Sequence, residues 1–304
     1  MGVRQIATAF ITGAGGGFGA RMARPLRQAG HTVVGTMRDS TGRNAAAAAQ
    51  LRALGVTVRE MDVTSDASVE QAIADTIAEV GTLDVVVNNA GVGVIGVQEA
   101  FTATDLQRLF DINVFGAHRV TRGATPHLRA NGSGRVVFMS SLLGRIAVPL
   151  YGPYNASKWA LEGLVENYSL ELSGFGIDVA IIEPGGYANS FIPNLVTPSD
   201  RDRVAALQPL SDAATQFLHG FEQALASNEA QDPQLVADAL LALVTAPAGT
   251  RPFRTIVDRM GMGDHLEGYN AHLAQVTAGI FGAFGIAPML ARRGAGAGQG
   301  AKRL

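Results

Sequence analysis

The stretch ATAFITGAGGGFGARMARPLRQA, residues 7–29, decides the fold of this chain. A short apolar run, Ala7 to Thr12, leads into a loop with five glycines between Gly13 and Gly19, and a helical pattern then continues to Ala29. Glycine permits the tight turn and close backbone approach, and a helix N-terminus offers free N–H groups and a positive dipole end. The order of strand, glycine loop and helix therefore predicts a cradle for phosphate.

The glycine loop has two alternative interpretations. A flexible surface loop would also be rich in glycine, but it would not explain why these glycines lie between a buried strand and a helix. A P-loop would bind the phosphates of a nucleoside triphosphate, but its lysine is missing here, which disfavours that class of enzyme.

Strands and helices are predicted to alternate about every thirty residues along the rest of the chain. Further strands are expected at 31–36, 56–61, 83–87, 135–139, 178–182 and 254–257, and helices at 44–54, 66–80, 104–129, 154–172, 233–245 and 265–284. This alternation predicts an α/β fold of the Rossmann type, a doubly wound, seven-stranded parallel sheet with helices on both faces. Polar and glycine signals gather at the carboxyl ends of the strands, where such a sheet binds its ligand.

One segment interrupts the alternation. Residues 187–232 contain three prolines and a helical stretch at 213–226 without a strand pattern. We interpret the segment as a helical insertion that covers the cleft as a lid, with a purely structural elaboration as the alternative. Residues 1–290 would then form a single dinucleotide-binding and catalytic domain, and the glycine-rich, basic residues 291–304 a disordered tail.

Composition excludes several classes of function. The 304 residues carry a formal net charge of −2 with a pI near 6.3, which argues against nucleic acid or an anionic membrane as the partner. Cysteine is absent, so disulfides and thiolate chemistry are excluded. The six histidines have no ligand-like spacing, and no metal is expected. The N-terminus lacks a signal-peptide pattern and no run of eighteen apolar residues occurs, so we expect a cytoplasmic protein.

Tyr154 and Lys158 provide the clearest chemical signal. Residues four apart on a helix lie on the same face, so the ammonium of Lys158 is expected beside the phenol of Tyr154. A neighbouring cation favours the phenolate and lowers the pKa of a tyrosine from its usual value near 10. The pair therefore predicts a proton donor and acceptor, although a solvated helix face would show the same spacing.

Seven motifs together resemble the short-chain dehydrogenase/reductase family, over roughly residues 5–260. In chain order they are Thr12-Gly13-x-x-x-Gly17-x-Gly19, Asp62, Asn88-Asn89-Ala90-Gly91, Asn113, Ser141, Tyr154-x-x-x-Lys158 and Pro184-Gly185. The serine precedes the tyrosine by thirteen residues, as the family motif requires. The turn at residues 36–39 and the chain length are most similar to the branch of hydroxysteroid dehydrogenases and bacterial carbonyl reductases.

The resemblance implies a role for each matching residue. Tyr154 would donate the proton in ketone reduction, and Lys158 would lower the pKa of Tyr154 and hold the nicotinamide ribose. Ser141 would hydrogen-bond the substrate oxygen, and Asn113 would position a water that links Lys158 to solvent. The cofactor would lie against Gly13, Gly17, the Phe18 backbone and Gly19 at its pyrophosphate, Asp62 and Val63 at its adenine, Asn89 on the adenosine side and Gly185 at its nicotinamide.

Two details of the catalytic and nicotinamide sites remain open in the sequence. Ser140 competes with Ser141 for the catalytic role, and the spacing favours Ser141. The family usually has a threonine shortly after the Pro-Gly turn, but Asn189 and Ser190 occupy that place here, and either side chain can donate a hydrogen bond.

The choice between NADP and NAD depends on the end of the second strand. By the register of the family, an acid that selects NAD would fall on Met37, and a basic residue that selects NADP would fall on Arg38. The planar guanidinium of Arg38 can pair with a 2′-phosphate, so NADP is predicted. Asp39 is the reason to keep NAD as the alternative.

The substrate is expected to be a lipophilic ketone or secondary alcohol. Mostly apolar side chains follow the predicted cofactor loops, although a plain core would use the same residue types: Val94, Ile95, Leu142, Leu143, Tyr151, Tyr187 and Phe191. By resemblance, the helices at 104–129 and 154–172 would form the interface of a homodimer or homotetramer. Two other functions remain open, a non-catalytic NAD(P)-binding sensor or scaffold and a lyase or epimerase on the same fold.

Overall fold

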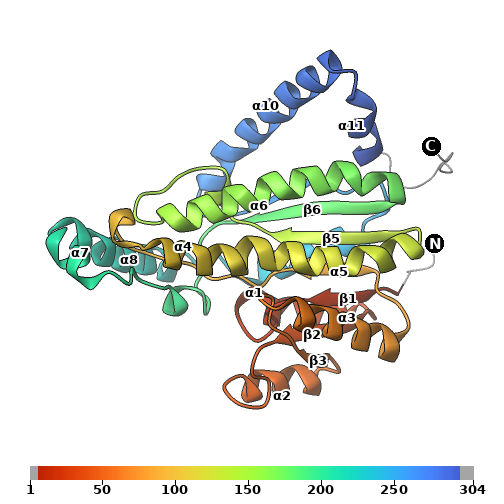
Figure 1. Ribbon diagram of the computed structural model, residues 1–304, viewed down its shortest axis with the longest axis horizontal. Helices are drawn as coiled ribbons and strands as arrows, with labels where there is room; N and C mark the ends of the chain where they lie inside the picture. The colour runs from red at the N-terminus through yellow and green to blue at the C-terminus, as the bar shows by residue number, and fades with distance from the viewer. Residues whose placement is uncertain (1–5, 295–304) are drawn as a thin grey trace.

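The computed structural model describes residues 6–294, and a seven-stranded, all-parallel sheet forms their centre (Figure 1). The strands are β1 Thr8–Ile11, β2 Thr32–Met37, β3 Thr57–Glu60, β4 Val85–Asn88, β5 Gly134–Met139, β6 Ile177–Pro184 and β7 Arg254–Val257. Their order in the sheet is β3-β2-β1-β4-β5-β6-β7. The chain reverses its direction of winding between β3 and β4, which is the topological switch of a doubly wound fold. The predicted fold class is confirmed.

Helices cover both faces of the sheet, because its central strands are buried on both sides. One face is covered by α1 Gly17–Gln28, α2 Ala45–Ala53 and α9 Gln234–Thr245, and the other by α3 Asp66–Val80, α5 Ala117–Ala130 and α6 Gly152–Glu171. Each layer has its own core, with Leu26 and Leu240 fully buried on the first face and Leu128 and Phe138 on the second.

The single helix expected at residues 104–129 has three parts. It begins as α4 Ala103–Phe110, widens into a π-helical turn at Asp111–Gly116, and continues as α5. Helical periodicity is the same before and after the turn, so the sequence pattern does not reveal it. Such π-helical turns are frequent at functional sites, and this one contains Asn113.

The segment at 187–232 is helical, with α7 Arg201–Ala206 and α8 Leu210–Ala226. Val196 pairs with Val94, which follows β4, so the insertion is tied to the loop beside the carboxyl edge of the sheet. In Figure 1 both helices lie at one end of the molecule, beyond that edge.

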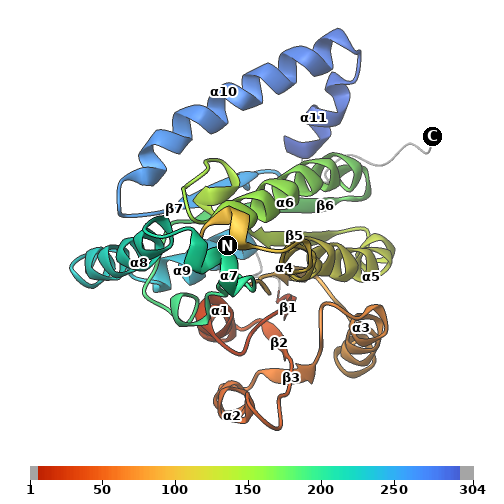
Figure 2. The same ribbon diagram turned by 60° about the vertical axis from the view of Figure 1, so that its left-hand side comes forward.

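The C-terminal part of the described chain forms two helices. The helix α10 Met262–Ala283 extends away from the body of the protein, and α11 Ala287–Gly294 returns to pack against α6 (Figures 1 and 2). The helix α11 extends to Gly294, four residues into the segment 291–304 that was predicted to be a disordered tail. Proline in the first turn and the alanine and leucine after it are compatible with a helix. Residues 295–304 of that prediction lie outside the described residues.

None of the helices within residues 6–294 is long and apolar enough to cross a bilayer.

Candidate active site

The carboxyl edge of the sheet brings most of the predicted site residues together. The loops after β1, β4, β5 and β6 end there, and they carry Gly13, Asn89, Ser141 and Gly185. The N-terminal half of α6 faces the same edge and supplies Tyr154 and Lys158.

Tyr154 is buried beneath aromatic side chains. It is 7% exposed, and its ring centroid lies 5.6 Å from that of Phe191 and 6.4 Å from that of Tyr151. Burial raises the pKa of Tyr154 above its usual value, and the neighbouring Ser141 hydroxyl acts in the opposite direction. The prediction of a lowered pKa is therefore wrong for this closed arrangement, because the loss of water around the phenol outweighs its polar neighbours.

Lys158 is also buried, and its ammonium has a fixed direction. Its Nζ donates a hydrogen bond to the carbonyl oxygen of Met139 at the end of β5, at 2.8 Å, and lies 5.6 Å from the centroid of the Tyr154 ring. Burial lowers the pKa of Lys158 to about 8, while the negative charge of Glu162 raises it. Lys158 is the only lysine of the chain besides Lys302, among 24 basic residues, and this scarcity is a further sequence signal that the position requires lysine.

The two serines after β5 face different surroundings. Ser141 lies beside Tyr154, and its Oγ accepts a hydrogen bond from the backbone N–H of Leu143 at 3.1 Å. Ser140 is turned toward α6, where a Cβ built on Gly144 would lie 2.7 Å from Ser140 Oγ and 3.1 Å from Glu162 Oε1. This geometry supports Ser141 as the residue at the substrate oxygen.

Asn113 joins the π-helical turn to the loop after β4. Its Nδ2 donates to the Val92 carbonyl and to Ser157 Oγ, and its Oδ1 accepts from the Val92 N–H at 2.9 Å. A Cβ built on Gly91 would lie 3.3 Å from Asn113 Oδ1 and 3.8 Å from Lys158 Nζ, so both atoms border the same point of the backbone. The structure thus brings Asn113 and Lys158 together.

The glycine loop has the geometry of a phosphate cradle. Gly13 and Gly17 have φ angles of 66° and 55°, which side-chain-bearing residues rarely adopt. A Cβ on Gly19 would lie 2.4 Å from the Gly13 carbonyl oxygen, so α1 can approach the loop only with glycine there. The first turn of α1 has neither an acidic residue nor a side-chain cap, which leaves its N–H groups and positive dipole end for an anion. These residues fit the pyrophosphate of a dinucleotide.

Ser190 is the nearer of the two candidates for the position after the Pro-Gly turn. A Cβ on Gly16 would lie 3.0 Å from Ser190 Oγ, so this hydroxyl faces the glycine loop. The Asn189 side chain is turned back and accepts a hydrogen bond from the Phe191 N–H at 2.8 Å.

Thr12 organises the glycine loop and was not among the predicted site residues. Its Oγ1 accepts hydrogen bonds from the N–H groups of Asn89 and Ala90 at 3.0 and 2.9 Å, and the side chain is 1% exposed. Asn89 in turn donates from Nδ2 to the carbonyl oxygens of Thr12 and Gly13. Asn89 therefore stabilises the backbone of the glycine loop through these hydrogen bonds. A threonine at the end of a strand that precedes glycines was the available signal.

The end of β2 separates the roles of Arg38 and Asp39. The carboxylate of Asp39 accepts the Arg43 N–H at 2.8 Å and so closes the turn before α2. The side chain of Arg38 is 51% exposed, and its ion pair with Asp62 is long, at 3.9 Å. Met37, where the family would place an acid, is apolar and 4% exposed. Arg38 is thus the side chain that remains available at the edge of the predicted adenosine site.

Asp62 and Val63 follow β3, which is paired with β2 in the sheet. Thr64 donates to Asp62 Oδ1 from its N–H and its hydroxyl, at 2.9 and 2.8 Å. Val63 is 9% exposed and packs against Gly116 of the π-helical turn. Asp62 lies beside Arg38, and both Asp62 and Val63 remain predicted contacts of the adenine.

The Pro-Gly turn after β6 is tightly packed. A Cβ on Gly185 would lie 2.1 Å from Asp258 Oδ1, so no larger residue fits there. Tyr187 was predicted to line the substrate site, but it lies elsewhere. Its hydroxyl donates to the Val257 carbonyl, and its ring packs edge-on against Phe18 in the core below α1. Its place in sequence could not show the direction of its side chain.

Most of the apolar residues that were predicted to contact the substrate lie around Tyr154. Those that share one cluster with Tyr154 are Val94, Ile95, Leu143, Tyr151 and Phe191, joined by Leu195, Ala214 and Leu218 of the insertion. Leu142 is fully buried outside this cluster.

A recess of about 520 Å³ between α3 and α5 contains none of the predicted site residues. Among residues 6–294, no group of three or more histidine or acidic side chains is arranged to hold a metal.

Comparisons with known proteins agree with this geometry. A family model described as short chain dehydrogenase matches residues 7–197. The chain is 33% identical to retinol dehydrogenase 8 of Homo sapiens, over 81% of this chain and 79% of that protein. It is also 33% identical to 17-beta-hydroxysteroid dehydrogenase type 1 of Mus musculus, over 78% of this chain and 70% of that protein. A solved short chain dehydrogenase/reductase from Burkholderia phymatum, in complex with NAD, superposes with a TM-score of 0.70 at 26% identity, over 84% of this chain and 90% of that one.

The role of Thr12 leads to a stability prediction. Replacing Thr12 with valine removes the acceptor of two backbone N–H groups at nearly constant volume, and we expect the free energy of unfolding to fall by about 1–3 kcal/mol. Thr12→Ser keeps the hydroxyl and is the matched control, with an expected loss below about 1 kcal/mol. Urea unfolding followed by circular dichroism measures both. Equal losses in the two variants would contradict the proposed hydrogen-bonding role.

Proposed function

The chain belongs to the short-chain dehydrogenase family, and on this premise we propose that it transfers a hydride between NADP and a lipophilic ketone or secondary alcohol. The relatives confirm the likeness to hydroxysteroid dehydrogenases that the sequence predicted. The observation that carries the proposal is the placement of Tyr154 in an apolar cluster at the carboxyl edge of the sheet, with Ser141 and Lys158 beside it.

The residues of the site divide the chemistry among them. A bound nicotinamide supplies the hydride, and the protein supplies orientation and protons. As hydride reaches a carbonyl carbon, negative charge develops on the oxygen, where the hydroxyls of Ser141 and Tyr154 can donate hydrogen bonds. Tyr154 then gives its proton to that oxygen, and the ammonium of Lys158 stabilises the phenolate that remains. In the oxidative direction, Tyr154 accepts the proton instead.

Removal of water is the second contribution of the site. With Tyr154 only 7% exposed, the reacting oxygen would lie in a medium where each hydrogen bond is stronger than in water. The same burial raises the pKa of Tyr154, so the phenol keeps its proton at neutral pH until the charge that develops on the substrate oxygen draws it away.

The apolar cluster supports the lipophilic substrate class. The side chains around Tyr154 are aliphatic and aromatic, and a ligand that replaced part of their contacts would need a similar surface. Two of the relatives are named for retinol and for 17-beta-hydroxysteroids, which are lipophilic alcohols. We extend that class to this chain without naming one compound.

The insertion at 187–232 acts in this proposal as a lid. Phe191 packs on Tyr154, and a Cβ on Gly93 would lie 2.3 Å from the Phe191 ring, so the segment is closed tightly over the phenol. Leu195 and Leu218 of the insertion belong to the same apolar cluster. A substrate reaches Tyr154 when these contacts are exchanged for contacts with the substrate itself, which requires the insertion to move.

The cofactor preference follows from the end of β2. The half-exposed guanidinium of Arg38, whose ion pair with Asp62 is long, can pair with a 2′-phosphate, whereas the carboxylate of Asp39 accepts a hydrogen bond within its own turn. NAD remains the alternative cofactor, which the relative from Burkholderia phymatum binds. The residues of the glycine loop fit the part that both dinucleotides share.

Location and assembly complete the proposal. We propose a cytoplasmic enzyme, because a reductase needs the supply of reduced dinucleotide found there. We also propose a homodimer or homotetramer that uses the helices expected from the resemblance. Exposed apolar side chains on the π-helical turn and on α6 support this interface: Phe115, Trp159 and Leu164.

The role of Tyr154 is tested by removing one atom. Tyr154→Phe should lower kcat/KM for ketone reduction by about 10²–10⁴-fold, because the general acid is lost, while NADPH binding changes little. Tyr151→Phe removes the same atom from the neighbouring ring, and we expect a loss below about tenfold. Absorbance at 340 nm with a panel of steroidal and aromatic ketones gives the rates. Equal losses in both variants would contradict the assignment, and a wild-type protein that binds NADPH but reduces none of the ketones would favour the sensor function.

Cofactor selection is tested at Arg38. Arg38→Ala should raise the KM for NADPH about 10–100-fold and leave the KM for NADH nearly unchanged, since only NADPH carries the 2′-phosphate. Arg52→Ala changes an exposed arginine at the far end of α2 and serves as the control. A similar rise for both cofactors in Arg38→Ala would remove the proposed role.

A further inference from the structure

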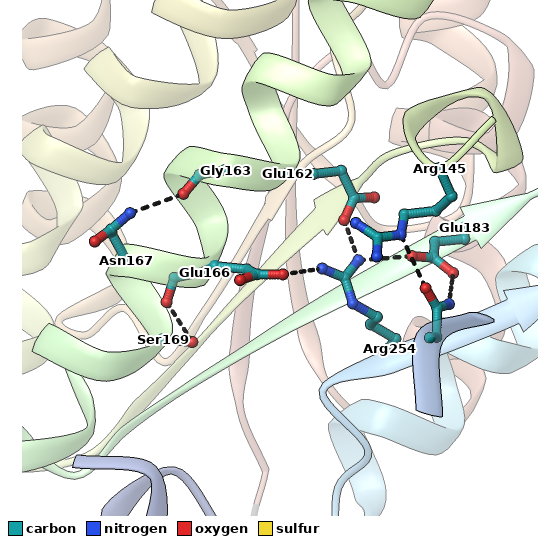
Figure 3. Close-up of polar contacts among 9 residues, drawn as sticks. Arg145, Glu162, Gly163, Glu166, Asn167, Ser169, Glu183 and Arg254 are labelled. Carbon is teal, nitrogen blue, oxygen red and sulfur yellow. Dashed lines mark hydrogen bonds and ion pairs between the residues drawn. The ribbon is translucent and has the colours of Figure 1, made fainter. Parts of the chain in front are cut away.

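A buried cluster of charges lies behind the catalytic face of α6. Arg254 of β7 forms ion pairs with three carboxylates, those of Glu162 and Glu166 on α6 and Glu183 on β6 (Figure 3). The distances to Glu166 and Glu183 are 2.6 and 2.7 Å. The mechanism above uses none of these four residues.

Glu162 and Glu183 are the deeply buried members of the cluster. Their side chains are 3% and 0% exposed, and that of Arg254 is 12% exposed. Glu183 receives a second hydrogen bond from Asn270 Nδ2 at 2.9 Å, and Asn270 accepts one from Arg145 Nε at 2.8 Å. Taking ionised carboxylates out of water is costly unless cations and hydrogen bonds compensate each of them. Arg254 alone leaves the three carboxylates with two negative charges in excess.

Glu162 lies one helical turn after Lys158 on the same helix. Residues four apart on an α-helix are neighbours on one face, with about 5–6 Å between their Cβ atoms, and both of these side chains are buried. One oxygen of Glu162 is paired with Arg254. The other, Oε1, is turned toward Ser140 Oγ across Gly144 and makes no further hydrogen bond with the part of the chain that the structure describes.

Burial and neighbouring charges shift the pKa values of Lys158 and Glu162 in opposite directions. Burial lowers the pKa of Lys158 to about 8, and Glu162 is the charge that raises it. Burial also raises the pKa of Glu162, and Arg254 counters this by stabilising the carboxylate. The other titratable groups that face this region are Tyr151 and Tyr154 at the start of α6, Glu166 further along it, Glu183 on β6 and Arg145 after β5.

We propose that Glu162, held ionised and in place by Arg254, is a positioning residue that keeps the buried ammonium of Lys158 charged behind Tyr154. This inference rests on the proposed function for its consequence in catalysis. The arrangement of Glu162, Arg254 and Lys158 itself does not depend on which substrate is reduced. Ser140 belongs to the same arrangement, because its hydroxyl faces the second oxygen of Glu162.

The direction of the pH effect follows from the charges. An ammonium is present below its titration midpoint and is lost above it. In Glu162→Gln a neutral amide replaces the negative neighbour, so the ammonium becomes less favourable and its midpoint should fall by about one pH unit or more. Because the ammonium stabilises the Tyr154 phenolate, the alkaline limb of the kcat/KM profile for reduction should move to lower pH by the same amount.

The composition of the chain makes a direct measurement simple. Lys158 and Lys302 are its only lysines, so protein labelled with ¹³C at lysine Cε gives two NMR signals. We expect the Lys158 signal to titrate about one pH unit or more lower in Glu162→Gln than in wild type. Lys302 should titrate alike in both proteins and serves as the internal reference.

Glu166→Gln is the matched control. It removes a carboxylate that also binds Arg254, but two helical turns from Lys158 and at a side chain that is 33% exposed. We expect its Lys158 midpoint to stay within about 0.3 pH units of wild type, because the charge is farther away and screened by water. A purely structural role for the cluster would instead affect both variants alike.

Three outcomes are decisive. A lower midpoint in Glu162→Gln alone supports the proposal, whereas an unchanged midpoint in this variant, or the same fall in both, overturns it. If Glu162→Gln does not fold, Glu162→Asp against Glu166→Asp gives the same comparison, since a shorter side chain withdraws the charge from Lys158. A wild-type protein without turnover would overturn the proposed function, but the Lys158 titration would still decide this inference.

Discussion

The hydrogen bond from Lys158 to the carbonyl of Met139 joins α6 to the end of β5, and the rest of the site depends on it. It places a cation inside the protein, one turn from Tyr154 and beside the loop that carries Ser141. Burial opposes that cation, and the protein compensates from both sides, through a backbone carbonyl in front and the carboxylates bound to Arg254 behind. The apolar cover over Tyr154 thus lies above a cation whose burial is partly compensated by these groups.

The cofactor side depends on a different constraint, the close approach of backbone segments. Glycine at positions 13 and 19 lets the loop, the start of α1 and the end of β4 come within contact distance. Thr12 and Asn89 then satisfy the backbone groups that this approach would leave unpaired. The result is a glycine turn that leads into the uncapped N-terminus of α1, which is suited to an anion. At the neighbouring strand end lies Arg38, the residue to which we assign the choice between the two dinucleotides.

Local patterns in the sequence predicted the fold well. The bounds of α3 and β7 match the structure to the residue, because apolar periodicity and the flanking turn residues define both elements. The spacing of Tyr154 and Lys158 was sufficient to place both on one face of α6. The π-helical turn around Asn113 was missed, because it does not change the helical pattern on either side of it. The helix α11 was missed because it is short and follows a break at Gly285, close to a glycine-rich segment.

Properties that depend on distant contacts could not be predicted. The raised pKa of Tyr154 comes from burial, to which the ring contact with Phe191, 37 residues further along the chain, contributes. Tyr187 follows a predicted site turn, yet its ring faces the core. The pairing of Arg254 with Glu162 joins residues 92 positions apart, so no local pattern announces it. In each case the surroundings of the side chain depend on tertiary packing, which the local sequence does not show.

Hydride transfer itself is the central claim, and tracing the hydride tests it most directly. The protein would be incubated with NADPH deuterated at C4 of the nicotinamide and a set of steroidal and aromatic ketones, followed by mass spectrometry of the alcohols. With both C4 positions deuterated, so that either face of the nicotinamide delivers deuteride, we predict alcohol products that carry one deuterium on the carbinol carbon. Dinucleotide binding by calorimetry without a deuterated alcohol from any ketone would contradict the account and indicate a binding protein that kept the fold.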